Sequence, residues 1–201
     1  DTVALILDTR GNGDFAKGFI PQSINIGING DFAPWVGALI ADVKQPIILV
    51  TEIGQEEESV TRLSRVGFDN LIGHLEGGFE AWKKAEKETD IVNRITATEF
   101  TKEVKIGKSK VIDIRKDSEY AAEHVDEAFS KPLAKINEWI KDVDPKEPFF
   151  IHCAGGYRSM IAASILQARG FRNFIEIEGG FNAIAKTEVS RTDFVCQSKI
   201  L

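Results

Sequence analysis

The amino-acid sequence predicts an α/β protein of two similar domains, each a mainly parallel sheet flanked by helices. The first observation is an internal repeat with a period of a little over 100 residues. The second is that each half alternates short apolar strands with helical patterns, which is typical of parallel α/β units. The matching segments are Leu5–Arg10 with Val111–Arg115, Asp42–Val50 with Asp142–His152, Leu63–Leu71 with Leu166–Phe174, and Leu75–Trp82 with Ile177–Ile184.

The boundary between the domains is expected in the charged stretch at residues 83–93, so that the first domain spans residues 1–90 and the second 91–201. The second domain opens with Ile95–Phe100, and Thr98 is the expected N-cap of a helix that runs to Val104. The first domain has no matching opening. We therefore expect it to be truncated at its N-terminus, with the parent chain continuing upstream of Asp1.

Composition restricts the classes of function. The chain has 201 residues, of which 43% are hydrophobic and 28% charged, as in ordinary soluble globular proteins. Its net charge of −6 disfavours a nucleic-acid partner, and no apolar run is long enough for a membrane span. The two cysteines and three histidines have no metal-site or disulfide spacing, and no signal peptide is evident. We expect a cytoplasmic protein with no membrane partner.

The stretch Pro148–Gly170 carries the chemistry, and it predicts a strand, a tight loop and a helix. Phe149–Ile151 is an apolar run suited to a buried strand. The loop is expected at residues 154–157, with Arg158 and Ser159 at its exit. Helical spacing begins at Met160, and Gly170 is a typical helix stop. Cys153 should therefore lie at the carboxyl end of a strand and face the N-terminus of a helix.

This placement suits a reactive thiolate, because helix N-termini and neighbouring arginines stabilise a negative charge. The two glycines let successive N–H groups of the loop point inward toward an anion. A buried, inert cysteine requires none of these flanking residues. We predict Cys153 as the catalytic nucleophile, with Arg158 orienting an anionic substrate and Tyr157 at the pocket mouth. The predicted substrate-binding residues are Ala154, Gly155, Gly156, Tyr157, Arg158 and Ser159.

The segment HCAGGYRS resembles the active-site loop of the rhodanese sulfurtransferases, Cys-x-x-Gly-x-Arg followed by a helix. It also resembles the His-Cys-x5-Arg signature of cysteine-dependent phosphatases. Four residues separate Cys153 from Arg158, and in the rhodanese family the shorter loop accompanies sulfur transfer. The order of an Asp-x-Arg strand, the loop strand, a helix and a strand ending in Glu-Gly-Gly also resembles the rhodanese domain. The resemblance implies a tandem pair of rhodanese-like domains.

The resemblance implies a sulfurtransferase that moves sulfane sulfur from thiosulfate or a low-molecular-weight persulfide to a thiol or other nucleophile through a Cys153 persulfide. Two alternatives stay open: a cysteine-dependent phosphatase or arsenate reductase, and a non-catalytic persulfide-sensing or protein-binding module. No metal or organic cofactor is expected. The pair is also similar to the C-terminal part of metallo-β-lactamase/rhodanese fusion proteins of persulfide metabolism, so an upstream metallo-β-lactamase-like domain is expected in the parent chain.

The first domain departs from the family pattern at its catalytic position. Thr51 aligns with Cys153, and no arginine follows in its loop. Three acidic residues, Glu56, Glu57 and Glu58, stand at the expected helix start, where they would repel an incoming anion. We predict an inactive copy retained for packing or partner contact, with unrelated Thr or Glu chemistry as the rival interpretation.

Several other residues are predicted to be structural. Asp113 and Arg115 are expected to form an ion pair that also involves Glu119, and His124 is expected to support the structure. The side chain of His152 should alternate away from the nucleophile, which argues against a general base. Residues 178–180 are expected to form a turn, and Cys196 is expected to be buried or half-exposed.

Overall fold

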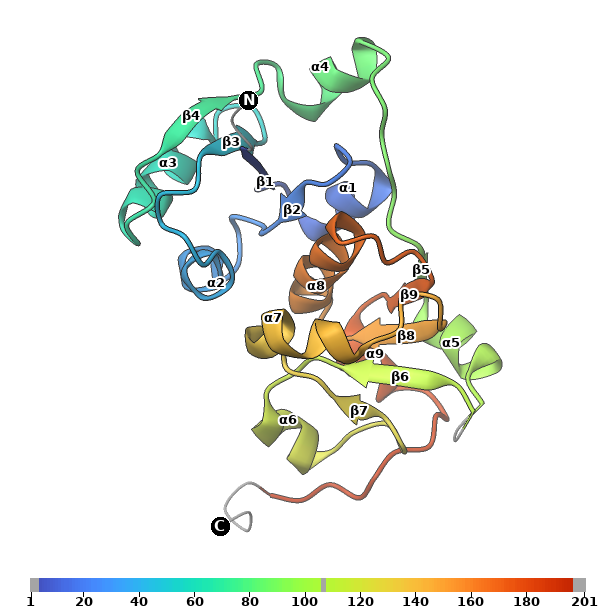
Figure 1. Ribbon diagram of the computed structural model, residues 1–201. Helices are drawn as coiled ribbons and strands as arrows, with labels where there is room; N and C mark the ends of the chain where they lie inside the picture. The colour runs from blue at the N-terminus through green and yellow to red at the C-terminus, as the bar shows by residue number, and fades with distance from the viewer. Residues whose placement is uncertain (1–3, 106–107, 197–201) are drawn as a thin grey trace. The chain divides into compact units, whose positions relative to one another are not determined.

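The computed structural model describes residues 4–105 and 108–196. The main division of the chain falls between Val92 and Asn93 and separates two compact units, each built around its own parallel sheet (Figure 1). The expected fold class, two α/β domains with parallel sheets and flanking helices, is confirmed.

In the first unit, strands and helices alternate along the chain, and the four strands form a sheet in the order β2-β1-β3-β4 with all neighbours parallel. The elements are β1 Leu5–Asp8, α1 Asn12–Lys17, β2 Ile24–Asn25, α2 Phe32–Leu39, β3 Ile47–Val50, α3 Glu56–Ser64, β4 Leu71–His74 and α4 Gly78–Lys84.

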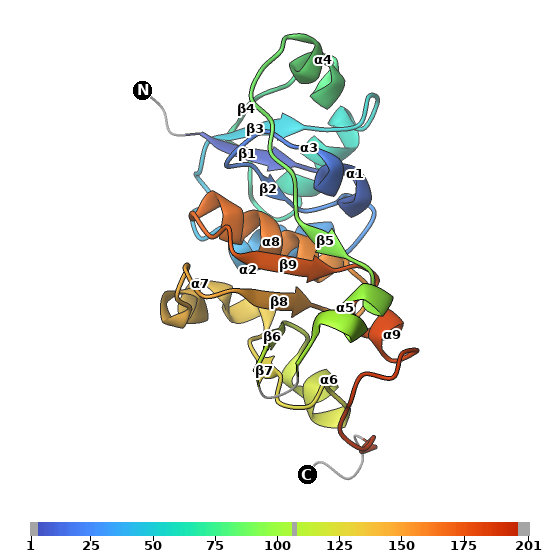
Figure 2. The same ribbon diagram turned by 90° about the vertical axis from the view of Figure 1, so that its right-hand side faces the viewer.

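The second unit has five parallel strands in the order β5-β9-β8-β6-β7. Figure 2 shows β9 and β8 side by side, with α5 and α9 near their ends. The elements are β5 Arg94–Ile95, α5 Ala97–Glu103, β6 Lys110–Asp113, α6 Asp117–Ala122, β7 Phe129–Ser130, η1 Leu133–Lys135, α7 Ile136–Trp139, η2 Ile140–Asp142, β8 Phe149–His152, α8 Tyr157–Ala168, β9 Phe174–Ile177 and α9 Gly180–Ile184.

The two sheets share one strand order, which confirms the repeat. Strands β2, β1, β3 and β4 of the first unit correspond to β7, β6, β8 and β9 of the second. Within the described residues, β5 and α5 have no counterpart in the first unit. Helix α5 is capped by Thr96, whose side chain accepts a hydrogen bond from the Glu99 N–H while Glu99 bonds back to the Thr96 N–H. The expectation that Thr98 is the N-cap is therefore wrong, because this reciprocal capping box satisfies two N–H groups two residues earlier.

The core of the second unit holds the strand ends in place. Buried side chains of α5, β6 and α9, including Phe100, Val111 and Ile184, form one apolar cluster on a face of the sheet. Helix α8 has buried residues all round, including Met160, Ile161 and Leu166. Strand β8 lies between β9 and β6, so its carboxyl end is the anchored point from which the loop at Cys153 begins.

Among the helices of the described residues, none combines the length and the apolar character needed to cross a membrane.

Candidate active site

Cys153 directly follows β8, and α8 begins only four positions later, at Tyr157. The loop therefore consists of Ala154, Gly155 and Gly156, and it is shorter than the sequence suggested. Arg158 and Ser159 belong to the first turn of α8 and do not precede the helix. Gly156 makes the tight entry possible, because its φ of +100° lies in a region that residues with a Cβ rarely adopt.

The Cys153 sulfur lies at the N-terminal end of α8 and is nearly enclosed, since the residue is 1% exposed. The Gly156 N–H donates to Sγ at 3.1 Å, and the Ser159 Oγ lies 3.4 Å from Sγ. An N–H group aimed at sulfur stabilises negative charge on it. This contact agrees with the expected inward-pointing loop, while the contribution of the other N–H groups between Ala154 and Ser159 stays a prediction.

The beginning of α9 holds the loop from outside. The N–H of Phe181 donates to the Cys153 carbonyl at 2.7 Å, and the N–H of Asn182 donates to the Ala154 carbonyl at 2.9 Å. Gly180 permits this close approach, because a Cβ there would lie 2.4 Å from the Cys153 carbonyl oxygen. The turn at residues 178–180 is present as expected, and it also positions the loop that follows Cys153.

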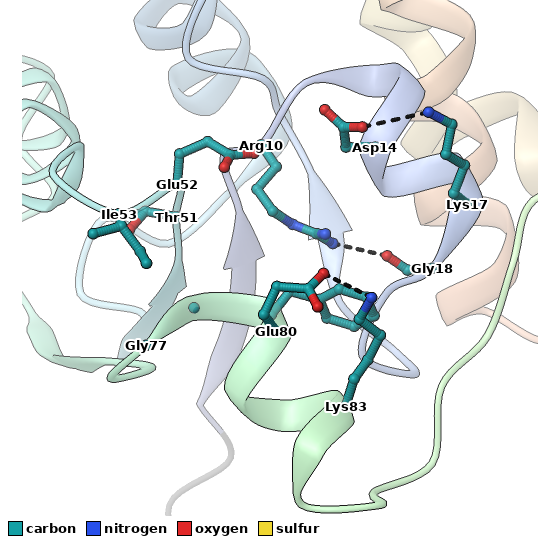
Figure 3. Close-up of a pocket in the computed structure, with 12 residues that line it drawn as sticks. Arg10, Asp14, Lys17, Gly18, Thr51, Glu52, Ile53, Gly77, Glu80 and Lys83 are labelled. Carbon is teal, nitrogen blue, oxygen red and sulfur yellow. Dashed lines mark hydrogen bonds and ion pairs between the residues drawn. The ribbon is translucent and has the colours of Figure 1, made fainter.

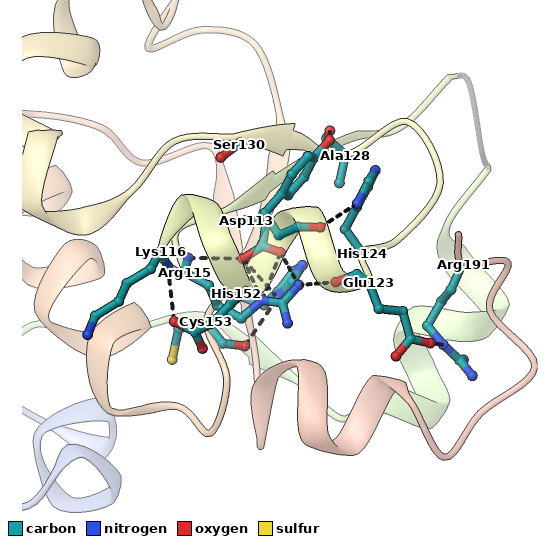
Figure 4. Close-up of polar contacts among 12 residues, drawn as sticks. Asp113, Arg115, Lys116, Glu123, His124, Ala128, Ser130, His152, Cys153 and Arg191 are labelled. Atoms are coloured by element: carbon teal, nitrogen blue, oxygen red, sulfur yellow. Dashed lines mark hydrogen bonds and ion pairs between the residues drawn. The ribbon is translucent and has the colours of Figure 1, made fainter. Parts of the chain in front are cut away.

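Asp113 and Arg115 form a buried platform beside β8. The Arg115 Nη2 lies 2.6 Å from Asp113 Oδ2 and also donates to the Glu123 carbonyl at 2.7 Å. Its guanidinium covers the Phe181 ring at 3.9 Å from the centroid. Figure 4 shows Asp113 and Arg115 close to His152 and Cys153. The platform thus fixes α9, which in turn holds the loop.

His152 is fully buried beneath the loop. Its Nδ1 lies 3.2 Å from the Cys153 carbonyl oxygen, an acceptor to which it can only donate, and 3.9 Å from Asp113 Oδ1. Burial lowers the pKa of His152, against the opposing effect of Asp113, so the ring is neutral. Its side chain contacts the Cys153 carbonyl, Asp113 and the Phe181 ring, and the expectation that it is not the general base stays a prediction.

Arg158 does not present an unpaired charge. Its guanidinium donates to both carboxylate oxygens of Glu119 in α6, at 2.6 and 2.8 Å. The hydrogen bonds from Arg158 lower the pKa of Glu119, and the same carboxylate raises the pKa of Arg158. Glu119 was expected beside Asp113 and Arg115, but its side chain pairs with α8, because a bidentate carboxylate matches the planar guanidinium.

A second carboxylate lies behind Ser159 and was not expected from the sequence. The Ser159 Oγ donates to Glu176 Oε1 at 2.5 Å, and the Arg94 Nε donates to Glu176 Oε2 at 2.7 Å. Glu176 is fully buried in β9. Its signal in the sequence is a single charged residue inside the apolar run Phe174–Ile177.

Two segments of the chain, residues 1–85 and 96–187, match the family model of the rhodanese-like domain. The chain belongs to the rhodanese-like domain family. The match covers both units, so the protein carries two rhodanese-like domains in tandem.

Relatives of the rhodanese-like domains include sulfurtransferases. The thiosulfate sulfurtransferase GlpE of Coxiella burnetii is 28% identical over 110 residues, which cover 55% of this chain and 81% of that protein. A rhodanese-like domain protein of Staphylococcus aureus matches with 27% identity and a TM-score of 0.44, over 49% of this chain and 97% of its own. A thiosulfate sulfurtransferase of Pseudomonas aeruginosa matches with 16% identity and a TM-score of 0.42, over 96% of this chain and 41% of its own.

The first rhodanese-like domain keeps the platform but has a different loop. Arg10 pairs with Asp8 at 2.6 Å and covers the Phe79 ring at 4.1 Å, as Arg115 does in the second domain. The position that corresponds to Cys153 holds Thr51, which is buried, and α3 opens with three glutamates. A cavity of about 420 Å³ lies beside Thr51, and Figure 3 shows the Lys17 and Lys83 ammonium groups at its side paired with neighbouring carboxylates.

Two further predicted residues are placed by the structure. Tyr157 is half-buried at the start of α8, and its role at the pocket mouth stays a prediction. Cys196 is exposed, not buried or half-exposed, because the segment that carries it has no regular secondary structure.

Proposed function

We propose that the second rhodanese-like domain is a sulfurtransferase with Cys153 as its nucleophile. The Cys153 thiolate attacks the outer sulfur of thiosulfate, the bond between the two donor sulfurs breaks, and sulfite leaves with its electron pair. A low-molecular-weight persulfide would react in the same way and release its thiolate. A thiol or other nucleophile then removes the sulfur from the Cys153 persulfide and regenerates the thiolate.

The observation that carries this proposal is the position of the Cys153 sulfur. It lies at the carboxyl end of a central strand, and the Gly156 N–H donates to it at 3.1 Å just before the N-terminus of α8. A preorganised donor of this kind favours the anionic sulfur both before and after sulfur is taken up. The name of the Coxiella burnetii relative, a thiosulfate sulfurtransferase, supports the same chemistry.

Arg158 is proposed to orient the anionic donor. In the free protein its guanidinium is occupied by Glu119, so an incoming dianion must compete with that carboxylate. Because the Arg158 and Glu119 side chains are 17% and 29% exposed, the pair is accessible to a small solute. Donor binding would then exchange one anionic partner of Arg158 for another without leaving the half-buried guanidinium unpaired.

The loop length separates sulfur transfer from phosphatase or arsenate chemistry. Four residues lie between Cys153 and Arg158, and a tighter ring has less room for a tetrahedral oxyanion above the sulfur. Insertion of a glycine between Gly155 and Gly156 should abolish sulfur transfer from thiosulfate to cyanide. A native protein that hydrolyses an aryl phosphate faster than it transfers sulfur would contradict the proposal.

The decisive experiment is the intact mass after treatment with thiosulfate or glutathione persulfide. We expect a gain of one sulfur atom that cyanide removes, in the native protein and in Cys196→Ser. Cys153→Ser should gain none, because a serine hydroxyl cannot carry sulfane sulfur. If the sulfur is gained but never passed to cyanide or a thiol, the domain is a persulfide-binding module and not a transferase.

A further inference from the structure

The fully buried carboxylate of Glu176 lies in line with the proposed nucleophile. A chain of contacts runs from the Cys153 Sγ to the Ser159 Oγ at 3.4 Å, and from the Ser159 Oγ to Glu176 Oε1 at 2.5 Å. All three residues are at most 1% exposed. This series of contacts runs from the end of β8 through the first turn of α8 to β9, and none of its three groups is exposed to solvent.

Stability alone does not explain this carboxylate. Burial of an ion pair such as Glu176 with Arg94 costs desolvation energy that the pairing returns only in part, and apolar replacements are often no less stable. The first domain offers a comparison, because its repeat places His74 at the position of Glu176. His74 is exposed, and the same domain has Thr51 in place of the nucleophile. The copy without the cysteine thus has no buried carboxylate at this position.

The direction of the hydrogen bonds follows from the chemistry of the groups. An ionised carboxylate only accepts, so the Ser159 hydroxyl proton points to Glu176. The free lone pairs of Ser159 then face the Cys153 sulfur and accept from its S–H group. Every link is oriented for proton movement away from sulfur.

We propose that Glu176 accepts the thiol proton of Cys153 through the Ser159 hydroxyl. The S–H bond breaks as its proton passes to the Ser159 oxygen, while the Ser159 hydroxyl proton passes to Glu176 Oε1. The products are a thiolate, an unchanged serine and a neutral carboxylic acid. The three side chains together hold two protons and one negative charge both before and after the step. Glu176 acts only through Ser159 and does not touch the reacting sulfur.

The surroundings of Glu176 favour a proton acceptor. Burial raises the pKa of Glu176, and the neighbouring Glu178 acts in the same direction, whereas Arg94 and the Ser159 hydrogen bond oppose it. Near the sulfur, Arg158 provides the cationic charge that interacts with Cys153, and the neutral His152 faces the Cys153 carbonyl. A carboxylate of raised pKa beside a thiolate stabilised by an N–H group narrows the free-energy gap for the transfer.

The place of this step in the catalytic cycle rests on the proposed function. The test of the proton transfer itself does not depend on sulfurtransferase activity. Iodoacetamide alkylates thiolates and needs no sulfur donor. In a Cys196→Ser background the sole thiol is Cys153. Because the thiol and the carboxyl share one proton over a range of pH, the alkylation rate should show a plateau that extends to acidic pH.

The variants remove the acceptor or the connection. Glu176→Gln keeps the shape of the side chain but cannot take the proton. Below the midpoint of its pH–rate profile, the alkylation rate should therefore fall about tenfold for each pH unit, as for an isolated thiol. Ser159→Ala should give the same loss without removing the Arg94–Glu176 pair, and the double variant should lose no more than either single variant. Glu178→Gln is the matched control, because Glu178 also pairs with Arg94 but has no hydrogen bond to Ser159 among the described contacts.

A plateau that persists in Glu176→Gln or Ser159→Ala would overturn the proposal, as would its absence in the native protein. Loss of the plateau in Glu178→Gln as well would also overturn the proposal. The plateau would then depend on the negative charge near Arg94 and not on the hydrogen bond between Ser159 and Glu176. Thermal unfolding checks that each variant is folded. If Glu176→Gln does not fold, the alkylation profile of Ser159→Ala decides whether the proposal stands. Sulfur uptake by mass is scored separately, so a protein with the plateau but no sulfur uptake would refute the transferase and leave the relay standing.

Discussion

The close approach of Gly180 to the nucleophile loop can be tested by adding one carbon atom. In Gly180→Ala the new Cβ would lie 2.4 Å from the Cys153 carbonyl oxygen and 2.8 Å from that of Ala154. Both neighbours are backbone atoms of Cys153 and the loop after it, so they cannot move aside as a flexible side chain can. The loop or α9 must therefore shift.

The loss of folding stability expected in Gly180→Ala has two parts. Gly180 has a φ of +55°, and an alanine in this left-handed region costs about 1–2 kcal/mol. The steric overlap adds about 1–3 kcal/mol, as for other overpacked sites. At about 2–4 °C for each kcal/mol in a chain of this size, the melting temperature should fall clearly. Displacement of Cys153 by roughly an ångström should lower sulfur transfer on the order of 100-fold.

The first domain supplies the matched control. Gly78 has a φ of +60°, and a Cβ there would lie 3.0 Å from the Thr51 carbonyl oxygen. Gly78→Ala should therefore carry a similar backbone cost with a milder overlap, and should leave transfer from thiosulfate to cyanide unchanged. Thermal unfolding and transfer rates are measured for both variants. Native stability and activity in Gly180→Ala would refute the argument that α9 must touch the loop backbone.

Three further outcomes are expected. Glu119→Gln should weaken the pair with Arg158 and lower the KM for thiosulfate several-fold in initial-rate assays, and a higher KM would contradict competition for the guanidinium. Because Arg158 lowers the pKa of Glu119, the pair should stabilise the fold above the unfolded-state pKa and cease to do so as pH falls through the folded-state pKa. Urea unfolding from neutral to acidic pH should therefore show a steeper loss for the native protein than for Glu119→Gln. Thr96→Ala should cost about 1 kcal/mol in urea unfolding through loss of the capping box, whereas Thr98→Ala should cost less.

The sequence alone was sufficient for the architecture and for the place of Cys153 between a strand and the N-terminus of a helix. The repeat and the alternation of apolar strands with helical segments predicted two parallel α/β domains, because these patterns depend on residues that are close together in the sequence. The segment around Cys153 likewise predicted a strand, a loop and a helix. Two errors were local. Helix α8 begins at Tyr157, three residues before Met160, and the cap of α5 lies at Thr96, although Thr96 and Glu99 already have the Thr-x-x-Glu spacing of a capping box in the sequence.

Only the tertiary structure decided which side chains meet around Cys153. Glu119 and Arg158 are 39 positions apart, and Ser159 and Glu176 are 17 apart, yet both pairs are in hydrogen-bond contact. Glu176 is recognisable in the sequence only as a charge within an apolar strand, and its partner depends on which helix covers that strand. Such contacts form where separate elements pack, so their identity follows from strand order and helix placement, which local periodicity does not specify.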